Sequence, residues 1–231
     1  FSILFEAIEF FKLRSFWYFI TGATWSPGVI GSQFGALPIF AGTFVITIIA
    51  LGVAIPVGLG SAIYMSEYAS ANIRDYLKPL LEILAGIPTV VYGFFAAITV
   101  APLVVQIAEF FGLEATFNSA LASGVVMGIM IIPVISSLSD DVIRAVPDSQ
   151  RKAAFALGMT HGETIKNIVL PSAMPGIISA SLLGLSKALG ETMIVVMAAG
   201  LRPNLSWNPL EDMTTVTVTI VNSLVGDFEF N

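Results

Sequence analysis

The amino-acid sequence predicts an all-α membrane protein, a polytopic bundle of spanning helices, on two observations. Of its 231 residues, 56% are hydrophobic and only 11% are charged, whereas a soluble domain carries about 25% charged residues. In addition, no charged residue occurs between Ser15 and Ser66. A chain of this composition cannot cover itself with a polar surface. A lipid bilayer must therefore be its solvent, and its backbone groups must be paired within helices.

Apolar segments long enough to cross a bilayer follow one another along the chain, since about 20 helical residues suffice. We expect spans at 39–65, 80–107, 121–138 and 177–201, and parts of a first and a last span at 1–19 and 216–225. The intact protein would then have six spans, the first and last truncated here, with 1–231 in a single transmembrane domain. The chain reads as a fragment, because it lacks an initiator Met and ends in a polar run at 227–231.

The basic residues predict which connections face the cytoplasm. Alternation of the spans puts 67–78 and 140–166 on one side, and 12–38, 109–118 and 202–213 on the other. Six basic residues fall on the first side: Arg74, Lys78, Arg144, Arg151, Lys152 and Lys166. Three fall on the second side: Lys12, Arg14 and Arg202. Cytoplasmic connections carry the excess of Lys and Arg, so 140–166 is predicted to be cytoplasmic.

The segment 148–171 gathers charges of both signs and has the pattern of two short helices. Asp148 is a candidate N-cap for a helix over 149–157, because its carboxylate can accept from free N–H groups. Gly158 follows, and glycine most easily takes the left-handed conformation just beyond a helix end. We therefore expect a turn at Gly158.

A second helix should begin directly after this turn. Thr160 and Glu163 stand three residues apart, which is the spacing of a capping box. Pro171 lacks an N–H group and its ring clashes with the preceding turn. We therefore expect the second helix to end near Leu170, which makes the whole segment a helical hairpin.

The small residues of this hairpin carry a family resemblance. Ala153-Ala154, Gly158 and then Ile168-Val169-Leu170-Pro171 resemble the EAA loop of ABC importer permeases. The resemblance implies a cytoplasmic coupling loop over 148–171 that docks into a groove of an ATPase subunit. The implied coupling residues are Lys152, Ala153, Ala154, Gly158, Ile168, Leu170 and Pro171. Lys152 stands where the family usually has an acidic residue. Taken alone, the segment reads as an ordinary amphipathic hairpin.

Two further blocks, Gly86-Ile-Pro-Thr-Val-Val-Tyr-Gly93 and Ala188-Leu-Gly-Glu-Thr-Met193, look like those of PstC-type permeases of bacterial phosphate importers. The resemblance implies a type I ABC importer permease that moves phosphate through the inner membrane. It also implies a PstA-like second permease, an ABC ATPase dimer and a periplasmic phosphate-binding protein as partners. ATP and Mg would be bound by the ATPase, with no cofactor in this chain. Molybdate or sulfate is the alternative substrate.

Two charged residues fall inside the expected span 177–201. Lys187 and Glu191 are four residues apart and would share one helix face. A charge inside a span is costly, so both should face protein or a water-filled path. With Thr192 they are candidates for the translocation path. The alternative is a salt bridge that only holds the helix in the bundle. The resembling family has an arginine where this chain has Lys187, and lysine lacks the planar fork that grips phosphate oxygens.

The sequence offers little for catalysis within the chain. It has no cysteine and only one histidine, His161, so no metal site of the usual Cys or His type is expected. There is no P-loop pattern for ATP and no basic tract for nucleic acid. The pair Asp140-Asp141 reads as a solvated helix end, and His161 as a surface residue. We therefore expect a non-catalytic permease. A channel or an intramembrane enzyme that uses Lys187 and Glu191 is the alternative of a different class.

Overall fold

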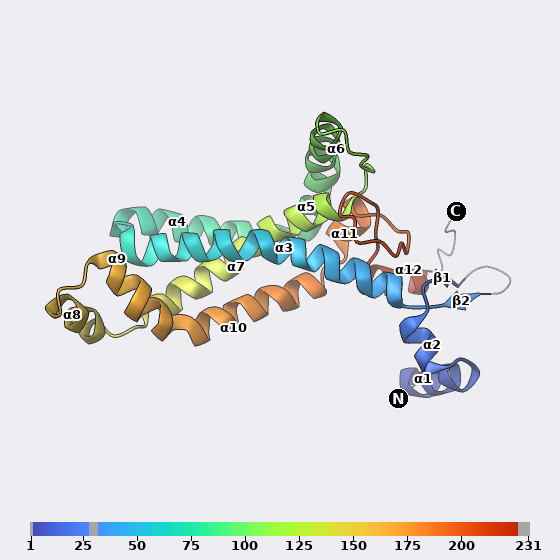
Figure 1. The fold of residues 1–231 in the computed structure, drawn as a ribbon, viewed down its shortest axis with the longest axis horizontal. Helices are drawn as coiled ribbons and strands as arrows, with labels where there is room; N and C mark the ends of the chain where they lie inside the picture. Colours follow the sequence, from blue (N-terminus) through green and yellow to red (C-terminus); the bar gives the residue numbers. More distant parts are fainter. Residues whose placement is uncertain (1, 28–31, 226–231) are drawn as a thin grey trace. The chain divides into compact units, whose positions relative to one another are not determined.

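The computed structural model describes residues 2–27 and 32–225, and most of them are helical (Figure 1). The helices are α1 (Ser2–Leu13), α2 (Phe16–Thr21), α3 (Leu37–Ile63), α4 (Ala71–Ala85), α5 (Thr89–Phe95), α6 (Ala101–Phe110), α7 (Ala120–Arg144), α8 (Asp148–Ala156), α9 (His161–Thr164), α10 (Leu170–Leu189), α11 (Met193–Ala198) and α12 (Val216–Val225). Three π-helical turns extend or join them: η1 (Tyr64–Tyr68), η2 (Ala96–Val100) and η3 (Ile165–Val169).

One short hairpin departs from the all-α pattern. β1 (Trp25–Ser26) pairs antiparallel with β2 (Gln33–Phe34), with Trp25 opposite Phe34. Gly28 and the polar run 227–231 lie outside the described residues. The hairpin is too small to change the fold class.

Four helical segments within the described residues are long and apolar enough to cross a membrane. They are Leu37–Tyr68, Thr89–Phe110, Ala120–Arg144 and His161–Leu189. The spans predicted at 39–65 and 121–138 are thereby confirmed. The spans predicted at 80–107 and 177–201 have different boundaries in the structure. The residues responsible are Pro88, Pro102, Pro171 and Gly190.

The span predicted at 80–107 exists as Thr89–Phe110, but its predicted start is wrong, because the chain is not one helix from 80 to 107. Residues 67–78, expected as a polar connection, mostly belong to α4, which ends at Ala85 with Gly86 as its C-cap. Pro88 follows, and a residue before proline avoids the helical conformation. The Tyr92 hydroxyl donates to the carbonyl of Leu84 at 2.9 Å, which satisfies one acceptor at the end of α4. A new helix therefore begins at Thr89.

The helix expected to end near Leu170 continues instead to Leu189. The π turn η3 ends directly before Leu170-Pro171, and the Leu170 N–H donates to the carbonyl of Ile165, five residues earlier. A π turn is wider than an α turn, so it leaves room for the pyrrolidine ring that would otherwise clash. The π turn η2 likewise ends directly before a residue that is followed by proline, in Ala101-Pro102.

The chain forms two compact units. Unit 1 consists of Phe1–Ile46, Gly93–Gly124 and Glu191–Asn231, and unit 2 consists of Thr47–Tyr92 and Val125–Gly190. Within unit 2, a Cβ at Gly128 of α7 would lie 2.8 Å from the Ala50 carbonyl oxygen of α3. These two helices can therefore pack this closely only because residue 128 has no side chain.

The core of unit 2 joins α3, α7, η3 and α10. Its buried apolar side chains are Ala62, Ile143, Val146, Val169, Ala173 and Ile177. Two ion pairs hold α4 to α7: Arg74 to Asp140 at 2.7 Å and Lys78 to Asp141 at 2.6 Å. Asp140 is fully buried, so its interpretation as part of a solvated helix end is wrong. A buried carboxylate needs such a partner, because an unpaired charge there is costly.

Candidate functional site

The α8–α9 hairpin forms where the sequence predicts it, with one difference at its start. Pro147, not Asp148, is the N-cap of α8, and Asp148 lies in the first turn. Proline has its φ fixed near the required value, and a carboxylate in the first turn favours the helix dipole. Gly158 has a φ of +84°, so the predicted left-handed turn is confirmed.

The predicted capping box of α9 is also confirmed. The Thr160 hydroxyl accepts a hydrogen bond from the Glu163 N–H at 3.4 Å. In return, a carboxylate oxygen of Glu163 accepts from the Thr160 N–H at 2.8 Å. The turn between α8 and α9 is therefore fixed at one end by a backbone conformation and at the other by a reciprocal cap.

Between α8 and the start of α10 lies a surface groove of about 430 Å³. Its lining is mostly apolar and consists of Gln150, Ala153, Ala154, Leu157, Met159, Asn167, Ile168, Pro171 and Ser172. Four of the seven residues expected to couple to an ATPase are among them, namely Ala153, Ala154, Ile168 and Pro171. The other three, Lys152, Gly158 and Leu170, lie in the same hairpin without lining the groove. Leu157, at the rim, is 84% exposed.

Arg151 anchors the hairpin to η1 and to the end of α7. One of its nitrogens, Nη2, donates to a Glu67 carboxylate oxygen at 2.8 Å and to the Ile143 carbonyl at 3.0 Å, and Nη1 donates to the Val146 carbonyl. The side chains of Arg151 and Glu67 are only 16% and 6% exposed. Sequence reasoning missed this anchor, because Glu67 and Arg151 are 84 residues apart and no spacing rule joins them.

His161 provides a second contact between the hairpin and η1. Its ring stacks on Phe155 with centroids 6.3 Å apart and meets the edge of Tyr68 at 5.3 Å. Its Nε2 lies 3.2 Å from the Glu67 carbonyl oxygen. The ring is exposed, as expected, but it also packs between two aromatic side chains.

The span predicted at 177–201 breaks between Lys187 and Glu191. α10 ends at Leu189 with Gly190 as its C-cap, and α11 begins at Met193. The expectation that the two charges share a helix face is therefore wrong, because Glu191 lies beyond the helix. Glycine is the usual residue at such an end, since it has no side chain to favour the helix.

Glu191 is only 8% exposed, and its hydrogen bonds are with the start of α11. Its Oε1 accepts from the N–H groups of Met193 at 2.9 Å and Ile194 at 3.3 Å. Its backbone carbonyl accepts from the Thr217 hydroxyl at 3.0 Å. Thr192 is the N-cap residue of α11, without a capping bond from its side chain. Glu191 thus satisfies helix-start donors that Thr192 leaves free.

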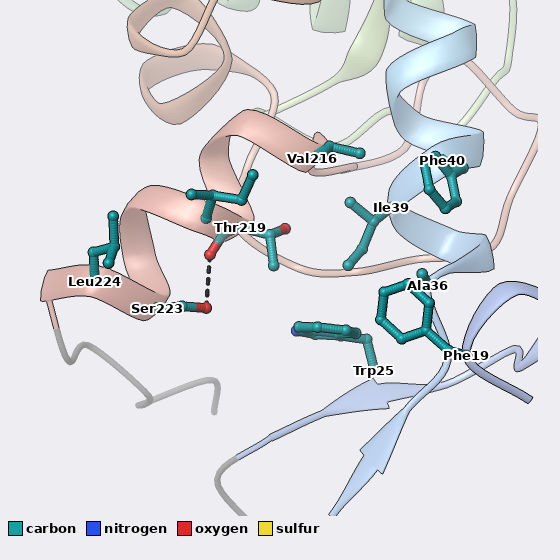
Figure 2. A pocket seen from close by; sticks show the side chains of 10 residues that line it. Phe19, Trp25, Ala36, Ile39, Phe40, Val216, Thr219, Ser223 and Leu224 are labelled. Carbon is teal, nitrogen blue, oxygen red and sulfur yellow. Dashed lines mark hydrogen bonds between the residues drawn. The ribbon is translucent and has the colours of Figure 1, made fainter. Parts of the chain in front are cut away.

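A separate pocket of about 350 Å³ lies in unit 1, and its lining is uncharged (Figure 2). It is lined by Phe19, Trp25, Ala36, Ile39, Phe40, Val216, Thr219, Ile220, Ser223 and Leu224. Within it, the Ser223 hydroxyl donates to the Thr219 carbonyl at 2.8 Å. None of these described residues is charged, so the pocket offers an anion no countercharge.

Taken together, the four spanning segments and the surface hairpin define a multi-pass membrane protein of the transport permease class. Residues 54–221 match the family described as binding-protein-dependent transport system inner membrane component. The chain belongs to that family.

Individual relatives agree with this assignment. The chain is 36% identical over 202 residues to a probable ABC transporter permease, YqgH, of Bacillus subtilis, covering 87% of this chain and 64% of that protein. It is 33% identical over 249 residues to phosphate transport system permease protein PstC 1 of Mycobacterium tuberculosis, covering 95% and 73% respectively. For a PstC protein of Mesorhizobium japonicum the values are 33% over 227 residues, 90% and 69%. The chain thus spans about two thirds of the length of these relatives.

A solved structure confirms the fold. The fold of the chain resembles that of a chain in a solved structure of the MetNI methionine ABC transporter in an inward-facing conformation. The TM-score is 0.56 and the sequence identity is 20%. The match covers 84% of this chain and 88% of that one. The predicted helical bundle of the ABC importer permease kind is therefore the fold of this chain.

Proposed function

We propose that the chain is the membrane-spanning permease subunit of an ATP-driven importer that carries inorganic phosphate into the cytoplasm. The observation that carries the proposal is the one-third identity to proteins named phosphate transport permeases, extending over 90% or more of the chain. In this proposal the chain itself is not catalytic. It forms one permease domain in the bacterial inner membrane.

The α8–α9 hairpin supports the coupling role. Its groove is open, mostly apolar and bounded by small side chains, which suits the insertion of a partner's side chains. Its contacts with η1 and the end of α7 would pass a displacement at the groove to the spanning helices. We propose Lys152, Ala153, Ala154, Gly158, Ile168, Leu170 and Pro171 as the residues that meet the ATPase.

The partners follow from the family and the proposed substrate. A PstA-like second permease would complete the path, two copies of an ABC ATPase would bind the cytoplasmic hairpins, and a periplasmic phosphate-binding protein would deliver the ion. ATP and Mg would be bound by the ATPase alone. Closure of the ATPase would then bias the bundle between two states.

The break between α10 and α11 is the proposed position of the path. Lys187 would offer a positive charge to the passing anion. Thr192, whose hydroxyl has no capping bond, would offer a neutral donor. Glu191 would set the geometry of this turn through its bonds to Met193 and Ile194. Binding must stay weak enough for release, so no enclosed cage of charges is needed.

Uptake by the complete protein tests the proposal. Full-length permease with its partner subunits, placed in cells that lack their own phosphate importer, should restore uptake of radioactive phosphate, with little competition from sulfate or molybdate. Gly158→Leu should abolish uptake while the protein still inserts, because a left-handed φ costs a branched residue about 1–2 kcal/mol and the turn sets the hairpin. ATPase copurification should fall with it.

Gly162→Ala is the matched control. Gly162 lies in α9 without a positive φ, and a Cβ there would meet nothing within 4 Å. This variant should transport normally. Normal phosphate uptake by Gly158→Leu would remove the hairpin from the coupling role, and preferential competition by molybdate or sulfate would change the substrate.

A further inference from the structure

A second cavity in unit 2 is polar, and none of its lining residues is among those proposed to meet the ATPase or the transported ion. It has a volume of about 450 Å³ and lies where η1 meets α4, beside the end of α7 and the start of α8. Its lining consists of Met65, Ser66, Glu67, Ala69, Ala71, Arg74, Arg144, Asp148 and Arg151. Three of these nine residues are arginines, and they come from three different helices.

The three arginines differ in how far their donors are used. Arg151 is engaged by Glu67 and two carbonyls. Arg74 donates from Nη2 to Asp140, and within this ion pair the Arg74 Nε and the Asp140 Oδ1 are both buried without a hydrogen-bond partner. Arg144 is exposed and has no ion pair or hydrogen bond among the described residues. A buried donor without an acceptor is costly, and most such groups in proteins have a partner.

The carboxylates in and beside the cavity are in contact with two of its three arginines. Glu67 is held by Arg151 at 2.8 Å. Asp148 is 81% exposed and 3.6 Å from Arg151, so solvent screens it. Arg74 is paired with Asp140 and Arg151 with Glu67, so Arg144 is the arginine of the lining that no carboxylate of the described residues contacts.

The start of α4 adds donors to the same cavity. Ala69 and Ala71 line the cavity on either side of the N-cap Ser70, whose side chain makes no capping bond. The first turn of this 15-residue helix holds no acidic residue. Its leading N–H groups therefore keep their partial positive charge, which favours an anion.

We propose that this cavity binds a phosphate group between Arg144, Arg74 and the start of α4. Guanidinium forks and helix-start N–H groups are the donors that match phosphate oxygens. The lining has no aromatic ring, so nothing in it would stack on a nucleotide base. The group can be inorganic phosphate or the headgroup of an anionic phospholipid, since the cavity lies at the ends of two spanning segments. The binding itself does not depend on the proposed transport function, whereas its place on the cytoplasmic side does.

Thermal unfolding of the complete transporter in lipid nanodiscs tests this site and separates the two sources. One arm uses phosphatidylcholine nanodiscs and titrates inorganic phosphate, with chloride at equal ionic strength as reference. The other arm uses no phosphate and compares phosphatidylglycerol with phosphatidylcholine. We expect one probe to raise the unfolding temperature. Arg144→Gln should weaken that response about tenfold or more in apparent affinity, as expected for a lost charged hydrogen bond.

Lys166→Gln is the matched control, because it removes an exposed basic residue that does not line the cavity. This variant should respond as the native protein does. An equal response in the native protein and Arg144→Gln, or an equal loss in Lys166→Gln, overturns the proposal. Phosphate uptake measured on the same variants keeps the outcomes apart, since a failed site with normal uptake leaves the transport function intact.

Discussion

Two turns in this molecule use a glutamate to bond the start of a helix, and they do so in opposite surroundings. Glu163 lies on the exposed α8–α9 hairpin and bonds the N–H of Thr160, within its own capping box. Glu191 lies in the α10–α11 break, is almost fully buried and bonds the N–H groups of Met193 and Ile194. If the exposed carboxylate of Glu163 were removed, water could bond the Thr160 N–H instead. If the buried carboxylate of Glu191 were removed, the N–H groups of Met193 and Ile194 would have no acceptor. The same contact should therefore stabilise the second turn far more.

The largest effect is expected at the buried ion pair between Arg151 of the hairpin and Glu67. It tests within one hairpin whether burial sets the cost of losing a contact. Arg151→Met should lower the free energy of unfolding by about 3 kcal/mol, because it leaves the Glu67 carboxylate buried and unpaired. The thermal unfolding of purified full-length protein measures this. Lys152→Met, at the adjacent exposed position, should change it by less than about 0.5 kcal/mol. Equal losses in both variants would show that burial does not set the cost.

The next effect concerns the buried glutamate. Glu191→Ala should cost about 2–3 kcal/mol, because two N–H groups lose their acceptor in an interior site. Glu191→Gln retains a carbonyl oxygen and should keep most of the stability. Unfolding temperature reports the fold, and uptake reports the path. If Ala is tolerated as well as Gln, Glu191 does not hold the start of α11.

A smaller loss is expected at the exposed cap. Thr160→Ala should cost about 1 kcal/mol, since it removes the hydroxyl that accepts from Glu163. Thr160→Ser keeps that oxygen and serves as its control. Proteolysis of the 157–163 turn measures local opening of the hairpin. A loss at Thr160 that exceeds the loss at Glu191 would reverse the comparison.

The smallest effect is a pH dependence in an exposed loop. Hydrogen bonds from Ser206, Asn208 and Asn204 lower the pKa of Glu211 from its ordinary value of 4.5. The stabilisation is therefore present above that value and is lost as the pH falls through the lowered pKa. Fluorescence of the exposed Trp207 between pH 7 and 3 should follow this loss. Glu211→Gln should remove the difference, and an unchanged titration would exclude Glu211 as its cause.

The two glutamates also show which features could be predicted from the sequence. Gly158, Thr160 and Glu163 lie within six consecutive residues, so a local pattern predicts their structure. Glu191 acts locally too, but the pattern of an apolar run hid the break at Gly190. The anchor between Glu67 and Arg151, and the burial of Asp140, depend on helices distant in the sequence. Composition and length predicted the spans but not all of their ends. The helix boundary falls at Pro88, whereas the helix continues through Pro171 to Leu189.

The helix that starts at His161 and ends at Leu189 is 29 residues long, so it measures about 43 Å at 1.5 Å per residue. It begins at the hairpin and ends two residues beyond Lys187. A rod of this length works as a lever: a small displacement at its surface end becomes a tilt at its far end. Two points interrupt its regular α-helical hydrogen bonding, the π turn η3 beside the groove and Pro175 further along α10. In the transporter proposed above, the stiffness of the helix at these two points would set how much of a displacement at the hairpin reaches the far end of the helix.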